Sequence, residues 1–134
     1  MLRGISPLLS PDLLETMYRM GHHDEIIFGD AHFPGESCNT KIIRADGLQI
    51  DDLLEAVLPL FVLDHVVDNP VMMMEPLPED KADAKISADY QKVHDGYHEI
   101  VQKHYPDTAP IAQVGKWDFY EQTKKAFAVV MTGD

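Results

Sequence analysis

Cysteine and basic residues are scarce in this sequence, and long hydrophobic runs are missing. One cysteine, Cys38, stands among seven methionines, so no intrachain disulfide can form and the composition suits a reducing compartment. We therefore expect a cytoplasmic protein. Residues 1–11 lack the apolar stretch of a signal peptide, and no later run approaches the roughly 18 residues of a membrane-spanning helix.

The shortage of basic side chains leaves a strongly acidic chain. Eleven lysines and arginines stand against 23 aspartates and glutamates, which gives a net charge of −12 at pH 7. Such a charge repels phosphate backbones and anionic lipid headgroups. The composition therefore predicts neither a nucleic-acid partner nor a membrane partner, whereas a neutral small molecule is not penalised in this way.

Two common catalytic motifs are also missing. The sequence has no glycine-rich phosphate loop of the P-loop or dinucleotide type, and it has no G-x-S-x-G turn for a nucleophilic serine. We therefore expect a protein that works without a nucleotide cofactor. Cys38 stands in a predicted loop with no base pattern beside it, which gives a nucleophilic cysteine little support.

The apolar runs and turn residues predict one domain over residues 1–134. Strands are expected at residues 25–31, 41–47, 71–74, 110–115 and 126–132, and helices at residues 11–20, 48–61, 88–105 and 116–127. Ser10 is the expected N-cap of the first helix, and residues 32–40 are expected to form a loop. Because strands and helices alternate, we predict a three-layer α/β/α fold with a largely parallel sheet.

Titratable side chains crowd the segment MGHHDEIIFGDAHFP, residues 20–34. Histidine exchanges protons near neutral pH, so one histidine with an orienting carboxylate is enough for proton transfer. A metal site at His22, Asp30 and His32 is disfavoured because their spacing matches no compact ligand pattern, so we predict no metal. A solvated turn remains the alternative. His94 and His98, four residues apart on a predicted helix, are expected to lie on a solvated helix face.

Five stretches in the order LLSPDLL, MGHHDEIIFGDAHFP, IRADGL, LLEAVLPLF and FYEQTKKAFAVVMTGD resemble the ribose pyranase and L-fucose mutarotase family, most closely its L-fucose mutarotase branch. The likeness runs in register from Leu2 to the C-terminus. Its most specific parts are the Gly-His-x-Asp-Glu-Ile segment, with Asp and Phe-Pro downstream, and the Phe-Tyr-Glu helix that leads into Ala-Phe-Ala-Val-Val.

The resemblance implies a cofactor-free isomerase that interconverts anomers or ring forms of a free monosaccharide, L-fucose first among them. It also implies a homo-oligomer, often a decameric ring. His22 matches the family's catalytic histidine, and Asp30, Asp64 and Tyr120 match positions that contact the sugar. Two other functions stay open: ribose pyranase activity, and a sugar-binding or regulatory protein without turnover.

The sequence departs from the family at three places. His23 stands where relatives usually have glycine, Gln113 and Lys116 stand where relatives often carry arginine, and the relatives continue beyond Asp134 into a tail containing Tyr-Gly-Asn that completes the pocket. We therefore expect that tail to be missing from residues 1–134.

A straight chain would hold His22 and Asp30 on the order of 26 Å apart. The chain must therefore fold back near residues 21–24 and again near Gly29, or neighbouring subunits must combine their residues.

Overall fold

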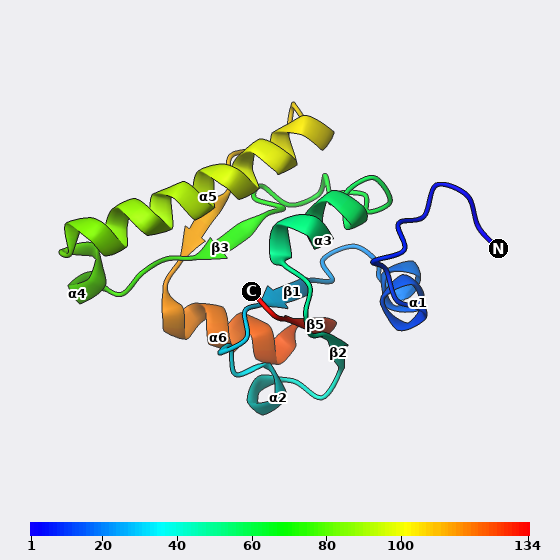
Figure 1. The fold of residues 1–134 in the computed structure, drawn as a ribbon, viewed down its shortest axis with the longest axis horizontal. Coiled ribbons are helices and arrows are strands. Elements are labelled where there is room, and N and C mark those ends of the chain that lie inside the picture. Colours follow the sequence, from blue (N-terminus) through cyan, green and yellow to red (C-terminus); the bar gives the residue numbers. More distant parts are fainter.

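A computed structural model describes all residues, 1–134, and shows two parallel sheets flanked by helices (Figure 1). The larger sheet has the order β1-β5-β2, with β1 at Ile26–Gly29, β2 at Ile42–Ala45 and β5 at Ala128–Thr132. Both outer strands run parallel to the central β5. The expected parallel pairing is thereby confirmed.

The central strand β5 separates two helical layers. All five of its residues are buried, as its apolar run indicates. Ala128 and Val130 pack with α1 (Pro11–Arg19) and α3 (Ile50–Val57), whereas Val129 and Met131 pack on the other face with α6 (Lys116–Lys125). Because neighbouring strand residues point to opposite faces, one short strand anchors both layers. The three-layer α/β/α arrangement is confirmed.

A second, smaller sheet holds the remaining strands. β3 (Met72–Met74) pairs in parallel with β4 (Ala112–Val114), and the long helix α5 (Ala84–His104) lies over them (Figure 1). Leu58, Val101 and Ile111 form the buried cluster between α3, α5 and this sheet. The strands are thus divided between two sheets, where the sequence predicted one.

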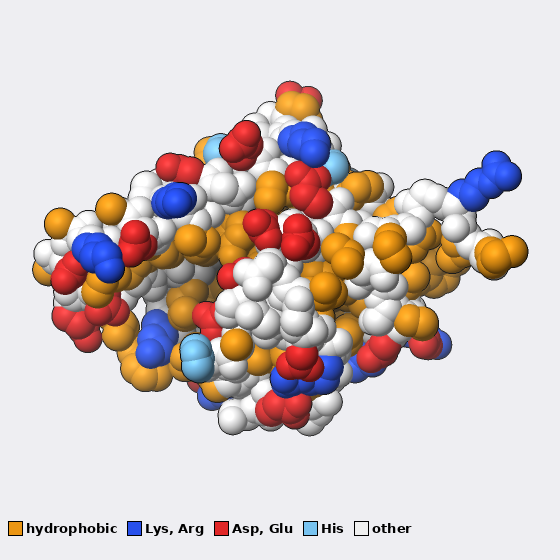
Figure 2. All heavy atoms as spheres, in the orientation of Figure 1, with side chains coloured by type: hydrophobic (Ala, Val, Ile, Leu, Met, Phe, Trp, Pro, Cys, Tyr) orange, Lys and Arg blue, Asp and Glu red, His pale blue; other side chains and the backbone are white.

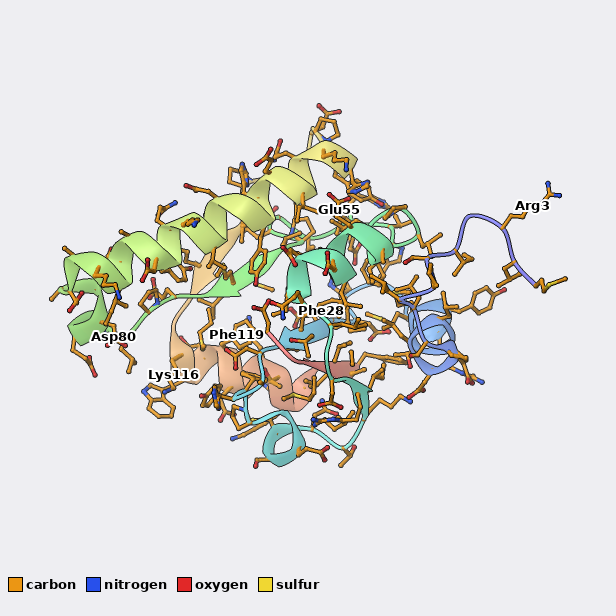
Figure 3. All side chains as sticks on the ribbon, in the orientation of Figure 1. Arg3, Phe28, Glu55, Asp80, Lys116 and Phe119 are labelled. Carbon is orange, nitrogen blue, oxygen red and sulfur yellow. The ribbon has the colours of Figure 1, made fainter.

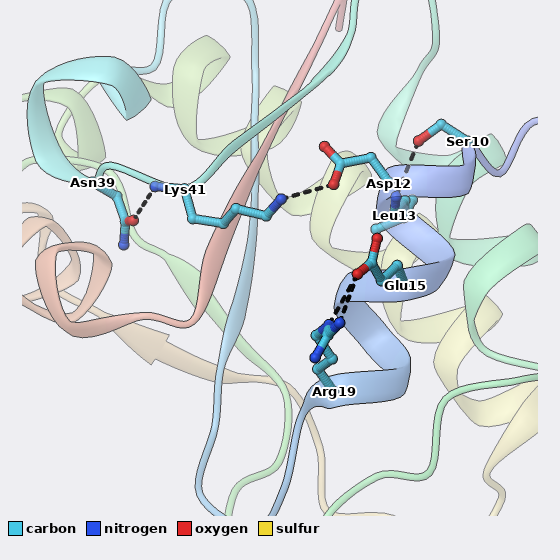
Figure 4. A network of polar contacts seen from close by, with 7 residues as sticks. All are labelled: Ser10, Asp12, Leu13, Glu15, Arg19, Asn39 and Lys41. Carbon is cyan, nitrogen blue, oxygen red and sulfur yellow. Dashed lines mark hydrogen bonds and ion pairs between the residues drawn. The ribbon is translucent and has the colours of Figure 1, made fainter.

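Helix α1 begins where the sequence indicates. Ser10 Oγ accepts a hydrogen bond from the backbone N–H of Leu13 at 3.1 Å, and Pro11 occupies the first helical position. Lys41 Nζ also lies 2.7 Å from Asp12 Oδ1, and this ion pair joins α1 to the segment before β2 (Figure 4). Local capping and one ion pair therefore fix the helix whose end leads to His22.

Two segments differ from the predictions. Residues 35–38, expected as loop, form the short helix α2 (Gly35–Cys38). Gly35 packs so closely on β5 that a Cβ at this position would collide with Met131 Sδ. The connection after β3 contains α4 (Pro78–Lys81), and α5 begins at Ala84, where the Asp83 side chain caps it. None of the helices is both long enough and apolar enough to cross a membrane.

Candidate active site

His22 and Asp64 form the centre of the candidate site. His22 Nδ1 lies 2.9 Å from Asp64 Oδ1, although 42 residues separate the two in sequence. Asp64 also accepts hydrogen bonds from the backbone N–H groups of His23 at 2.8 Å and Val66 at 3.1 Å. These hydrogen bonds hold the pKa of Asp64 well below its usual range, and the bond from His23 has the largest effect. The carboxylate therefore stays ionised and orients the imidazole.

The turn before β1 presents His22 to Asp64. The backbone N–H of Gly21 donates to Asp24 Oδ2 at 2.8 Å, and the backbone N–H of Asp24 donates to the Gly21 carbonyl at 3.2 Å. His23 is the only non-glycine residue with positive φ, at 69°. That region favours glycine, the residue that we expect in relatives at this position. The chain therefore folds back at residues 21–24.

A cavity of about 860 Å³ lies beside this pair. Most of its polar lining comes from the turn before β1 and the segment after α3, and Tyr18 of α1 adds a hydroxyl. The residues from the two segments are His22, His23, Asp24, Glu25, Asp64, His65 and Asn69. Its apolar wall includes Leu14, Met17 and Met20 of the first helical segment. Burial raises the pKa of Glu25. The volume falls within the range of small-molecule sites, and several of the polar groups that face it exchange protons.

The imidazole of His65 packs against that of His22. The two ring centroids are 5.6 Å apart and the ring planes meet at 81°, an edge-to-face arrangement. His65 directly follows Asp64, so the bonds that fix Asp64 also fix the position of His65. Sequence reasoning singled out Asp64 alone in this segment, because nothing local indicates that residue 65 returns to the turn that holds His22.

Asp30 and Tyr120 lie apart from this cavity, at the other end of β1. Asp30 follows the strand, and its Oδ1 accepts from the backbone N–H of His32 at 2.8 Å. Tyr120, on α6, packs edge-to-face on Phe33 at 5.7 Å, and Phe33 donates its backbone N–H to the Asp30 carbonyl. Within one chain, the structure thus brings His22 to Asp64 and Asp30 near Tyr120, but it does not unite the two pairs.

Acidic and phenolic groups surround the carboxyl ends of β1 and β5. Figure 2 shows acidic side chains gathered in the middle of this face, where Figure 1 places the C-terminus. Asp134 Oδ2 accepts from the backbone N–H of Ile50 at 3.0 Å and from Tyr97 Oη at 3.4 Å. Burial, then the negative charges of Asp134, Asp51 and Asp30, raise the pKa of Tyr97.

The two positions at which we expect arginine in relatives lie on β4 and α6. Gln113 is in β4, and Lys116 begins α6, three residues before Phe119 (Figure 3). Lys116 Nζ lies 5.3 Å from the ring centroid of Trp117 and 5.8 Å from that of Tyr120. A positive charge is therefore kept beside Tyr120.

The two histidines of α5 are not on a solvated face, so that prediction is wrong. The His94 side chain is 14% exposed, and its ring stacks on that of His98 at 6.3 Å. Both ring nitrogens of His94, Nδ1 of His98 and the hydroxyl of Tyr90 are buried without hydrogen-bond partners. No group of three or more histidine, cysteine or carboxylate side chains has a metal-binding arrangement.

Comparison with known sequences links the chain to one family along its whole length. The profile described as the RbsD / FucU transport protein family matches residues 3–134. Proteins named L-fucose mutarotase from Haemophilus influenzae strains 86-028NP and PittGG are each 42% identical over 134 residues, which cover 100% of this chain and 88% of theirs.

Solved structures agree with that assignment. The fucose mutarotase of Streptococcus pneumoniae, determined in complex with L-fucose, has a TM-score of 0.87 and 38% identity, over 99% of this chain and 89% of that chain. FucU of Bifidobacterium longum has a TM-score of 0.87 and 32% identity, over 98% of this chain and 90% of that chain. With full-length similarity in both sequence and fold, the chain belongs to the RbsD / FucU family.

Proposed function

We propose that this protein is a monosaccharide mutarotase that interconverts the anomers of L-fucose or a closely related aldose. Relatives named L-fucose mutarotase are 42% identical to this chain over 134 residues, and a similar structure was solved with L-fucose bound. The observation that carries the proposal is the His22–Asp64 pair at the edge of a cavity. It supplies an imidazole whose orientation is fixed and which can exchange protons with a bound sugar.

The reaction needs one proton removed and one proton delivered. The base removes the proton of the anomeric hydroxyl while an acid protonates the ring oxygen. The bond from the anomeric carbon to the ring oxygen breaks, and the former hydroxyl oxygen becomes the aldehyde oxygen. After the aldehyde turns its other face, the reverse transfers close the ring. Asp64 holds His22 Nδ1, so Nε2 is the nitrogen left to exchange protons with the sugar.

Asp30, Asp64 and Tyr120 are our proposed sugar contacts. Carboxylates accept hydrogen bonds from sugar hydroxyls, and the tyrosine offers an apolar wall with a polar tip. Their division between the two ends of β1 favours a homo-oligomer, with a decameric ring as the proposed form, in which neighbouring copies complete a site. We place the reaction in the cytoplasm, in keeping with the single cysteine and seven methionines.

Exchange NMR on free sugars tests the proposal. Full-length protein should speed the exchange between the two anomeric signals of L-fucose, and His22→Gln should lower that acceleration on the order of a hundredfold or more. His94→Gln, a histidine change on α5, serves as the matched control and should keep the rate per folded molecule.

The same measurement separates the alternatives. Faster pyranose-to-furanose exchange with D-ribose, and none with L-fucose, would favour ribose pyranase activity. Saturation transfer from protein to sugar without faster exchange of either sugar would favour a binding protein, and the mutarotase proposal would then be wrong.

A further inference from the structure

The imidazole pair beside Asp64 suggests more than one proton carrier. Mutarotation requires a base and an acid that act on two oxygens of the same carbon. A single imidazole must first take the proton of the anomeric hydroxyl and only then donate a proton to the ring oxygen, whereas two rings can carry out both transfers at the same time. His22 and His65 both line the 860 Å³ cavity, and their centroids are 5.6 Å apart.

His65 lies in an exposed turn whose two flanking residues are joined, because Val66 donates its backbone N–H to Asp64 Oδ1. Asp64 is clamped by the N–H groups of His23 and Val66, and it also binds His22 Nδ1. A single carboxylate therefore ties the turn before β1 to the segment after α3. Because His65 is the next residue, its ring is brought to the face of the His22 ring by the same bonds.

The geometry points to His65 as a second proton-transfer group, which acts together with His22 on the sugar in this cavity. This inference rests on the proposed mutarotase function. In the opening step, a neutral imidazole takes the proton of the anomeric hydroxyl, and the second ring, protonated, gives its proton to the ring oxygen. The bond from the anomeric carbon to the ring oxygen breaks and the aldehyde bond forms. Ring closure reverses both transfers and restores both imidazoles.

The other charged and titratable groups that line this cavity come from three segments. Helix α1 contributes Tyr18, the turn before β1 contributes His23, Asp24 and Glu25, and the segment after α3 contributes Asp64. Three of these five groups are carboxyl groups.

The test compares His65→Gln with His22→Gln and with the control His94→Gln, all in the full chain. We expect His65→Gln to slow L-fucose anomer exchange on the order of ten- to a hundredfold, less than His22→Gln. Sugar binding, measured by saturation transfer, should change less than about twofold if His65 moves protons rather than holding the ring. If one ring acts as base and the other as acid, the exchange rate of the unmodified protein should fall on both sides of an optimum pH. In His65→Gln, one of these two falling limbs should be lost.

A second variant separates chemistry from structure. His65→Ala leaves space in which free imidazole can bind, and added imidazole should restore exchange beyond its effect on L-fucose alone. The same addition to His22→Gln measures the background. A merely structural role for His65 would not give this rescue.

Three results would overturn the inference about His65. They are an unchanged rate and pH profile in His65→Gln, a loss of sugar binding with an unchanged rate per bound sugar, and no rescue by imidazole. In each case the proposed function survives if His22→Gln is still inactive. If the unmodified protein speeds no anomer exchange, the proposed function itself fails.

Discussion

His22 lies close to His65 beside Asp64, and His94 lies close to His98 on α5, yet the ring nitrogens of the two pairs have different surroundings. His22 bonds to an ionised carboxylate beside a cavity. His94 packs between Tyr90 and His98, neither of its ring nitrogens makes a hydrogen bond, and Nδ1 lies 3.6 Å from Asp95 Oδ1. A buried polar atom without a partner lowers stability, while an imidazole with a fixed partner and an open face can react. The difference lies in what surrounds each ring rather than in the spacing along the chain.

Removing the carboxylate from the first group should have the largest effect. In Asp64→Asn, His22 loses its ionised partner and the correct orientation of its ring, so anomer exchange should slow on the order of a hundredfold. Exchange NMR with L-fucose measures the rate, and circular dichroism checks that the fold is kept. If exchange persists at the original rate, the comparison between the two histidine groups is wrong.

Acid should weaken the protein through the same carboxylate. The pKa of Asp64 is lower in the folded than in the unfolded chain, so its stabilising effect is complete above the unfolded value, about 3.9, and is lost as pH falls toward the folded value. Urea unfolding at several pH values should therefore show a gap between the unmodified protein and Asp64→Asn that narrows below pH about 4. A gap that widens in acid would contradict the assigned direction.

Replacing His94 by an apolar residue tests the second group. His94→Leu removes two nitrogens that make no hydrogen bond from a mostly buried position, and we expect the free energy of unfolding to rise by about 1 kcal/mol. Urea unfolding measures the change, with His32→Leu at an exposed position as the control. A loss of stability would mean that these nitrogens have partners in solution.

The smallest expected effect is at the turn that presents His22. His23→Gly removes the cost of a positive φ for a side chain, but glycine also gains freedom in the unfolded chain, so the net gain should be about 0.5 kcal/mol. Thermal unfolding measures it. A clear loss would show that the His23 side chain contributes more than the backbone angle costs.

Sequence reasoning reached the fold better than the site. Ser10 and Pro11 mark a helix start through local bonds, and the apolar run of β5 marks a buried strand, so both could be predicted. The helix at residues 35–38 could not, because its close packing on Met131 is a tertiary contact.

For the site, spacing placed His94 and His98 on one helix face but could not say what that face packs against. The meeting of His22, Asp64 and His65 joins segments far apart in the chain. Only the family resemblance marked Asp64, and nothing in the sequence marked His65.

The order of the larger sheet has a consequence for how the protein is made. β1 and β2 do not touch each other, and each pairs only with β5, so Ile26 meets Ala128 as its partner and Ile42 meets Val129. Neither early strand can join a sheet before residues 128–132 have left the ribosome. Pairing between strands that are distant in sequence slows folding. It also leaves the apolar residues of β1 and β2 exposed to solvent while the rest of the chain is being synthesised.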